Sequence, residues 1–168
     1  MRGRPLNQKG LTLVELLIAM TVGAMIAGAV VASMFQLFMV SDRNSDWNAA
    51  FTQVQNAGYW VSHDAVQITQ EPTFDSGKLV TLDWVDWDDN DAHQVVYTLE
   101  GSGQLKRTYS FEENGVPSQE TIVIAQYIDP GTTCDWNEAE GVLTLVITAQ
   151  VGDQTVTRTY KVEARPLS

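Results

Sequence analysis

A single carboxylate lies inside a long apolar run near the start of the chain. Glu15 follows Gly10 and Leu11, and an uncharged stretch from Leu16 to Val40 comes directly after it. A carboxylate in a membrane costs about 2.5 to 3.5 kcal/mol at the bilayer centre and less near the interface. Glu15 therefore needs a proton or a positively charged partner, which makes it the first candidate for a functional residue.

A second group of polar side chains has ligand types that suit a cation. Asp86, Asp88 and Asn90 alternate as at the start of a calcium loop, and Asp91 adds another carboxylate. The pattern then departs from such a loop, because Asp91 stands where Gly is needed and Tyr97 where a bidentate Glu is needed. Two interpretations stay open: a weak calcium site, and a solvated hairpin tip that keeps the sheet from aggregating.

Catalytic chemistry has little support in the sequence. His63 and Asp64 are neighbours, but adjacent side chains on a helix point about 100° apart, and no nucleophile is tied to them. The sequence has no Gly-rich phosphate loop, no His and Cys metal pattern, and no nucleophile with a positioned base. We therefore expect a protein that is not an enzyme and needs no cofactor.

The net charge limits the kinds of partner that the chain can bind, and the single cysteine limits its disulfide bonds. The 168-residue chain has a net charge of −11, so its surface is strongly acidic, although Arg2, Arg4 and Lys9 lie together near its start. Such a surface repels phosphate, so direct nucleic acid binding is not expected. The lone Cys134 cannot form an internal disulfide, which leaves a free buried thiol or an intermolecular bridge.

The elements that position Glu15 begin with a helix. The uncharged stretch exceeds the roughly 20 residues that span a bilayer. Basic residues precede it and Asp42 and Asp46 follow it, so the positive-inside rule predicts a cytoplasmic N-terminus and an exported remainder. A secretory signal fits less well, because its apolar region would be only about 7 to 15 residues long.

The helical rhythm continues beyond the apolar run. Without a proline between Leu11 and Gln70, the two halves can form one helix that ends at Glu71-Pro72. An apolar stripe predicts that the second half packs on a core. The stripe consists of Trp47, Phe51, Val54, Gly58, Val61, Ala65 and Ile68.

Alternating apolar residues beyond Pro72 predict antiparallel strands. Three are expected to form a meander, at 78–87, 94–100 and 104–111, and three more at 121–128, 142–151 and 155–162. Residues 131–141, which include Cys134 and Trp136, are expected to form a loop. The predicted fold class is α+β, with a long N-terminal helix packed on an antiparallel β-sheet domain.

The stretch from Lys9 to Met20 resembles the processing site of type IV prepilins and type II secretion pseudopilins. Gly10 precedes the apolar helix, and Glu15 lies five positions after Gly10. Leu11 stands where Phe is usual. The resemblance implies that prepilin peptidase cuts between Gly10 and Leu11, that Leu11 becomes N-methylated, and that Glu15 guides assembly. In a filament, the ammonium of a neighbouring subunit's Leu11 would neutralise Glu15.

The resemblance implies a pilin-like fold and a structural role. We expect four parts: a cleaved leader at 1–10, a membrane and filament-core helix at 11–40, an amphipathic continuation at 41–70, and a β-rich exported domain at 71–168. The expected protein is a minor pilin or minor pseudopilin of the bacterial inner membrane and then of a filament. The expected partners are other subunits, prepilin peptidase, the inner-membrane assembly platform and, before assembly, lipid. The alternative is a single-pass anchored binding or sensory domain with an acidic sheet that could hold calcium.

Overall fold

The computed structural model describes residues 12–86, 91–113 and 116–164. Four of the candidate site residues lie outside these ranges, namely Gly10, Leu11, Asp88 and Asn90, and so do the basic residues Arg2, Arg4 and Lys9. The chain divides into two compact units, Met1–Asp42 and Arg43–Ser168, and each is described by itself.

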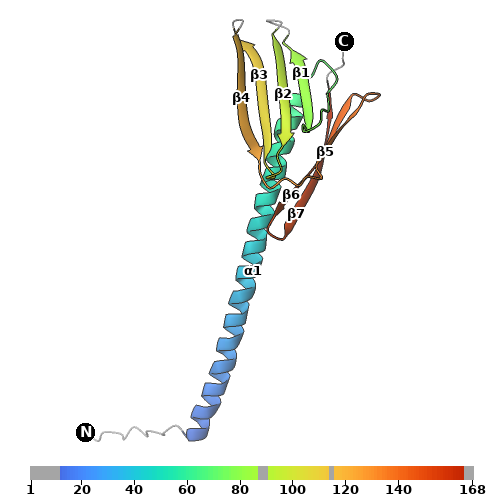
Figure 1. Cartoon of the computed structure of the whole chain (residues 1–168). Coiled ribbons are helices and arrows are strands. Elements are labelled where there is room, and N and C mark those ends of the chain that lie inside the picture. The colour runs from blue at the N-terminus through green and yellow to red at the C-terminus, as the bar shows by residue number, and fades with distance from the viewer. Residues whose placement is uncertain (1–11, 87–90, 114–115, 165–168) are drawn as a thin grey trace, which may run out of the picture. The chain divides into compact units, whose positions relative to one another are not determined.

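One helix and seven strands make up the described chain. Helix α1 comprises Leu13–Ala65. The first sheet has the order β1-β2-β3-β4, and the second has the order β5-β6-β7 (Figure 1). The strands are β1 Val80–Val85, β2 Ala92–Leu99, β3 Leu105–Glu113, β4 Val116–Ala125, β5 Thr133–Asn137, β6 Val142–Val151 and β7 Gln154–Glu163. Every strand pair is antiparallel, so the predicted α+β class is confirmed.

The second unit has one core, to which the C-terminal part of α1 and both sheets contribute. From α1, the buried apolar residues recur every three or four positions, which places them on one face of the helix. They are Ala50, Val54, Ala57, Val61 and Ala65. Gly58 lies on the same face, where a Cβ atom would come within 2.1 Å of the Tyr160 ring on β7. This close approach is why glycine is required at position 58.

Helix α1 ends earlier than the sequence predicted. The helix stops at Ala65 rather than at Gln70. The next residues leave the helix to run along β1, where the Thr69 N–H donates to the Asp83 carbonyl (3.1 Å). Ile68 is fully buried although it lies outside the helix. The apolar period continued past the helix end because the connecting segment also faces the core.

Two strand predictions were wrong. Residues 133–137, expected in a loop, form strand β5, which pairs with β6 and buries Cys134. The expected strand at 121–128 runs instead from Val116 to Ala125 and is the fourth strand of the meander. Short alternation in β5 gave a weak periodic signal, because only Cys134 and Trp136 face inward.

Candidate functional site

Glu15 takes part in a local hydrogen-bonded cap at the start of α1. The backbone N–H of Thr12 donates to Glu15 Oε2 (3.2 Å), and the Thr12 hydroxyl donates to the same oxygen (3.1 Å). In return, the Glu15 N–H donates to Thr12 Oγ1 (3.3 Å). This reciprocal arrangement is a capping box, which satisfies N–H groups that have no acceptor within the helix.

The cap adds a residue that the sequence reasoning missed. Thr12 was not singled out, although a Thr three positions before a Glu at the start of an apolar helix is the signal for a capping box. Both bonds to the carboxylate go to Oε2, and no hydrogen bond joins Oε1 to a residue that the structure describes. Glu15 therefore has one local partner and retains an oxygen that can accept from another group.

The surface of α1 from Leu13 to Asp42 is exposed throughout and is mostly apolar, with Glu15 and Asp42 as its two charged residues. Thr21 and Ser33 donate their hydroxyl protons to backbone carbonyls of the preceding turn (2.8 Å to Ile18, 2.9 Å to Ala29). A lipid-facing helix needs its polar groups satisfied in this internal way. Helix α1 is long and apolar enough to cross a membrane, and none of its most apolar 18-residue stretch is buried.

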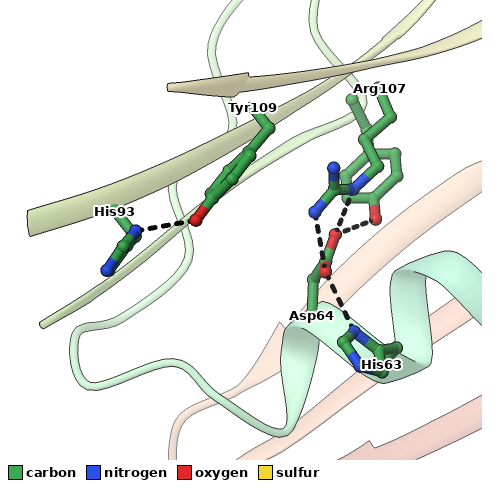
Figure 2. A network of polar contacts seen from close by, with 6 residues as sticks. His63, Asp64, His93, Arg107 and Tyr109 are labelled. Atoms are coloured by element: carbon green, nitrogen blue, oxygen red, sulfur yellow. Dashed lines mark hydrogen bonds and ion pairs between the residues drawn. The ribbon is translucent and has the colours of Figure 1, made fainter. Parts of the chain in front are cut away.

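A buried ion pair links α1 to the first sheet. Asp64 is only 1% exposed, and its carboxylate accepts from Arg107 Nε on β3 (2.7 Å) and from Arg107 Nη2 (3.0 Å). The Tyr97 hydroxyl also donates to Asp64, and His63 Nδ1 lies 3.3 Å from Oδ1 (Figure 2). Both carboxylate oxygens are thus engaged by side chains from α1, β2 and β3.

Electrostatics at this cluster stabilise the charged guanidinium. Burial alone would lower the pKa of Arg107, but the hydrogen bonds and the negative charge of Asp64 outweigh it and raise that pKa. Burial, with the charge of Asp64 adding to it, raises the pKa of Tyr97. Tyr97 therefore stays a neutral hydrogen-bond donor, and Arg107 stays a charged one.

Aromatic rings cover the ion pair. The Arg107 guanidinium carbon lies 4.9 Å from the Trp60 ring centroid and 5.0 Å from that of Tyr109. The Tyr109 hydroxyl shares a hydrogen bond with His93 Nδ1 (2.8 Å), and Figure 2 shows these two side chains beside the ion pair. Cations over aromatic faces are stabilised when they are withdrawn from water. The arrangement fixes the end of α1 on the sheet and offers no free carboxylate oxygen for chemistry.

The sequence contained the signal for this pair. Arg107 interrupts an apolar alternation on β3, and Asp64 interrupts the apolar stripe of α1. A charge at a core position on each of two elements implies a buried pair, since an isolated buried charge is strongly destabilising. The sequence reasoning weighed Asp64 only with His63 and therefore missed its partner.

Only the ends of the calcium candidate loop are described. The Asp86 N–H donates to the Asp91 carbonyl (3.0 Å), which closes the base of the turn between β1 and β2. Among residues 12–86, 91–113 and 116–164, no three His, Cys, Asp or Glu side chains gather in a way that could hold a metal ion. Because Asp88 and Asn90 lie outside these ranges, both interpretations of this loop, a weak calcium site and a solvated hairpin tip, stay untested.

Cys134 lies on β5 and is 8% exposed. Burial, with a smaller contribution from the nearby charge of Asp135, raises the pKa of the Cys134 thiol to about 12. The buried, protonated thiol is inert in its surroundings.

Comparison with known proteins locates the N-terminal stretch in a family. Residues 5–31 match the family model described as prokaryotic N-terminal methylation motif. Neither the curated proteins nor the solved structures gave a match to the chain. The matched residues include the capped start of α1 and more than half of its exposed surface, up to residue 31. The motif therefore indicates that this chain is a type IV prepilin-like protein.

Proposed function

We propose that this chain is a minor pilin or minor pseudopilin, a structural and assembly subunit of a type IV pilus or a type II secretion pseudopilus. The observation that carries the proposal is the N-terminal methylation motif at residues 5–31, which leads into an exposed apolar helix surface. Prepilin peptidase cleaves the chain between Gly10 and Leu11, and the new amine of Leu11 is methylated. Glycine before the cleaved bond lets the peptidase approach the backbone closely.

The membrane holds the subunit before assembly, with the N-terminus in the cytoplasm and the β-rich domain exported. The leader carries three basic residues, and carboxylates follow the apolar stretch, which is the charge asymmetry of that orientation. During assembly the apolar surface of α1 exchanges lipid for neighbouring helices. Small residues such as Gly23 and Gly28, which have no atom within 4 Å of a Cβ position, allow close helix approach.

Glu15 has two roles in this proposal. Oε2 caps the helix through Thr12, while the charge of the carboxylate attracts the Leu11 ammonium of an adjacent subunit. In an environment with little water such a pair is strongly favoured over an unpaired carboxylate. The role is structural, and we propose no enzymatic activity for the chain.

We favour a minor subunit over the bulk filament component. The exported unit has two sheets with seven strands, and the single cysteine rules out a C-terminal loop bounded by an internal disulfide. A large domain without that loop suits a subunit that is present in few copies.

Two substitutions separate the roles of Glu15. Glu15→Gln keeps an oxygen that can accept from Thr12 but removes the charge, whereas Glu15→Ala removes both. In the native host, cleavage is expected to proceed for both variants, as judged by the mass of the chain. We expect both to lose at least about tenfold in the fraction recovered with sheared filaments.

A control comes from the other end of the apolar surface. Asp42→Asn also removes an exposed carboxylate from the same unit, and incorporation should stay within about twofold of the unmodified chain. Normal incorporation of Glu15→Gln would show that only the cap matters and would overturn the proposed charge pairing.

A further inference from the structure

Strand β4 is the outermost strand of the first sheet and has one free edge. It pairs with β3 on one side. On the other side, no backbone hydrogen bond joins it to any part of the chain that the structure describes. Figure 1 shows β4 at the border of the four-stranded sheet. A free edge presents unpaired N–H and C=O groups to any extended chain that approaches it.

The opposite edge of the same sheet is covered. Thr73 and Thr81 exchange two backbone hydrogen bonds (3.1 and 2.9 Å), and the Thr69 N–H donates to the Asp83 carbonyl (3.1 Å). The Thr69 hydroxyl also accepts from the Val85 N–H (3.2 Å). The segment that follows α1 therefore occupies the outer edge of β1 and prevents strand addition there.

The edges of the second sheet are protected in other ways. Strand β5 has only five residues, which offers a short template. Strand β7 has ten residues but carries Arg158, Lys161 and Glu163 along its length. Short strands and charged side chains are the usual means of blocking edge pairing.

Strand β4 has the least protection where it is most apolar. Its first half contains Pro117 and Glu120, but residues 121–125 have the sequence Thr-Ile-Val-Ile-Ala, with no charge and no proline. Val123 is 45% exposed within this run. A run of five strand-forming residues on a free edge is a template for pairing with another strand. The molecule covers or charges its other long edges and leaves this one open.

Charge decides between a second copy and a different partner. A second copy would bring a further net charge of −11 and would place its own exposed Glu120 at the same edge. Lys106, which lies opposite Val123 on β3, is already paired with Glu100 (2.6 Å). Two acidic chains repel each other, whereas an acidic surface attracts a basic segment.

We propose that the outer edge of β4 binds an extended segment of a different protein, which adds to the sheet as a fifth strand. The segment has uncharged β-branched residues opposite residues 121–125 and a lysine or arginine that meets Glu120. Main-chain hydrogen bonds provide the affinity, and the basic residue sets the register. The proposal does not depend on the processing of the leader.

The test uses the full chain in detergent micelles and a labelled synthetic peptide of alternating valine and threonine with a lysine at each end. Binding is followed by fluorescence anisotropy, and the site is located by hydrogen exchange. We expect binding with slowed exchange in β4 and unchanged exchange in β7. A peptide with glutamate in place of lysine should bind at least about tenfold more weakly, and one with a central proline should not bind.

Edge variants connect the binding to β4. Val123→Lys and Thr121→Lys each place a charge on the edge at an exposed position and should weaken peptide binding at least about tenfold. Thr159→Lys, at an exposed position on β7, is the matched control and should stay within about twofold. The proposal is overturned if the peptide does not bind or if both β4 variants bind it normally. It is also overturned if the chain alone self-associates with β4 protected.

Discussion

The two parts of helix α1 differ in how their apolar side chains are covered. From Leu13 to Asp42 every residue is exposed, including large apolar residues such as Met25 and Phe35. From Arg43 to Ala65 one face of the helix is buried in the core of the second unit. The apolar face of the second part is covered by the core of this chain, whereas the apolar surface of the first part needs lipid or other helices to cover it.

The two notable carboxylates of the helix repeat this contrast. Glu15 is exposed and has one local partner, Thr12. Asp64 is buried, and the side chains of Tyr97, Arg107 and His63 engage both of its oxygens. A carboxylate that is fully paired within its own chain stabilises the fold, while one with a free oxygen can serve contacts between chains. The contrast supports a folding role for Asp64 and the assembly role that we propose for Glu15.

The largest effect on stability is expected at the buried pair. Asp64→Asn or Arg107→Met leaves a buried group without its charged partner, which costs about 3 to 5 kcal/mol. Urea unfolding of the full chain in detergent, followed by tryptophan fluorescence, measures the loss. The double variant Asp64→Leu with Arg107→Met should recover part of it, because no unpaired charge remains buried.

The surface pair between Lys78 and Asp75 is the matched control. Its atoms are also close (2.8 Å), but both side chains are well exposed. Lys78→Met should therefore change the free energy of unfolding by no more than about 1 kcal/mol. Equal losses at the two pairs would contradict the contrast between buried and exposed charges.

The thiol of Cys134 tests how well the second unit excludes water. Since burial raises its pKa from 9.0 to about 12, the thiolate fraction at pH 8 should be about a thousandfold smaller than in the unfolded chain. Alkylation by iodoacetamide should be slower by at least that factor in the native protein than in urea. The raised pKa also means that this thiol favours folding below pH 9 and that the contribution declines as the pH rises toward 12. Rapid native labelling at pH 8 would contradict the buried position.

Two glycines on α1, one in each part of the helix, test the difference in packing. Gly58→Ala would place a methyl group 2.1 Å from the Tyr160 ring and should cost about 1 to 3 kcal/mol in unfolding free energy. Gly28→Ala meets no atom within 4 Å and should leave stability unchanged or raise it by up to about 1 kcal/mol. A similar loss for both variants would mean that the two parts of the helix are packed alike.

The smallest effect is expected at the start of α1. Thr12→Ala removes the hydroxyl of the capping box and should cost about 1 kcal/mol of local helix stability. Faster amide hydrogen exchange in the first turn of α1 reports the loss. Thr52→Ala, whose hydroxyl bonds only to the Asn48 carbonyl within the helix, should leave exchange in that first turn unchanged.

Local patterns in the sequence predicted the helix and strands better than the contacts between residues far apart in the chain. The alternation in residues 142–151 gave β6 with its bounds, and the long apolar helix and the α+β class are confirmed. The predicted end of α1 was too late, because the core continues to bury residues after the helix stops. The predicted loop at 131–141 was wrong, because β5 is too short to show a clear period in the sequence.

The candidate functional residues divide in the same way. Glu15 was found from sequence because an apolar surrounding makes a lone carboxylate conspicuous. The Asp64 and Arg107 pair was missed because its two residues are 43 positions apart, and only the fold brings them together. The apolar neighbours of Arg107 on β3 were the one signal that could have prompted a search for a buried partner.

The central claim is that this chain is a prepilin-like subunit whose leader is removed. Mass spectrometry of the protein from cells that contain prepilin peptidase tests it most directly. We expect a mature chain that begins at Leu11 and carries one N-methyl group. An intact segment from Met1 to Gly10 on the membrane-bound protein in those cells would contradict it.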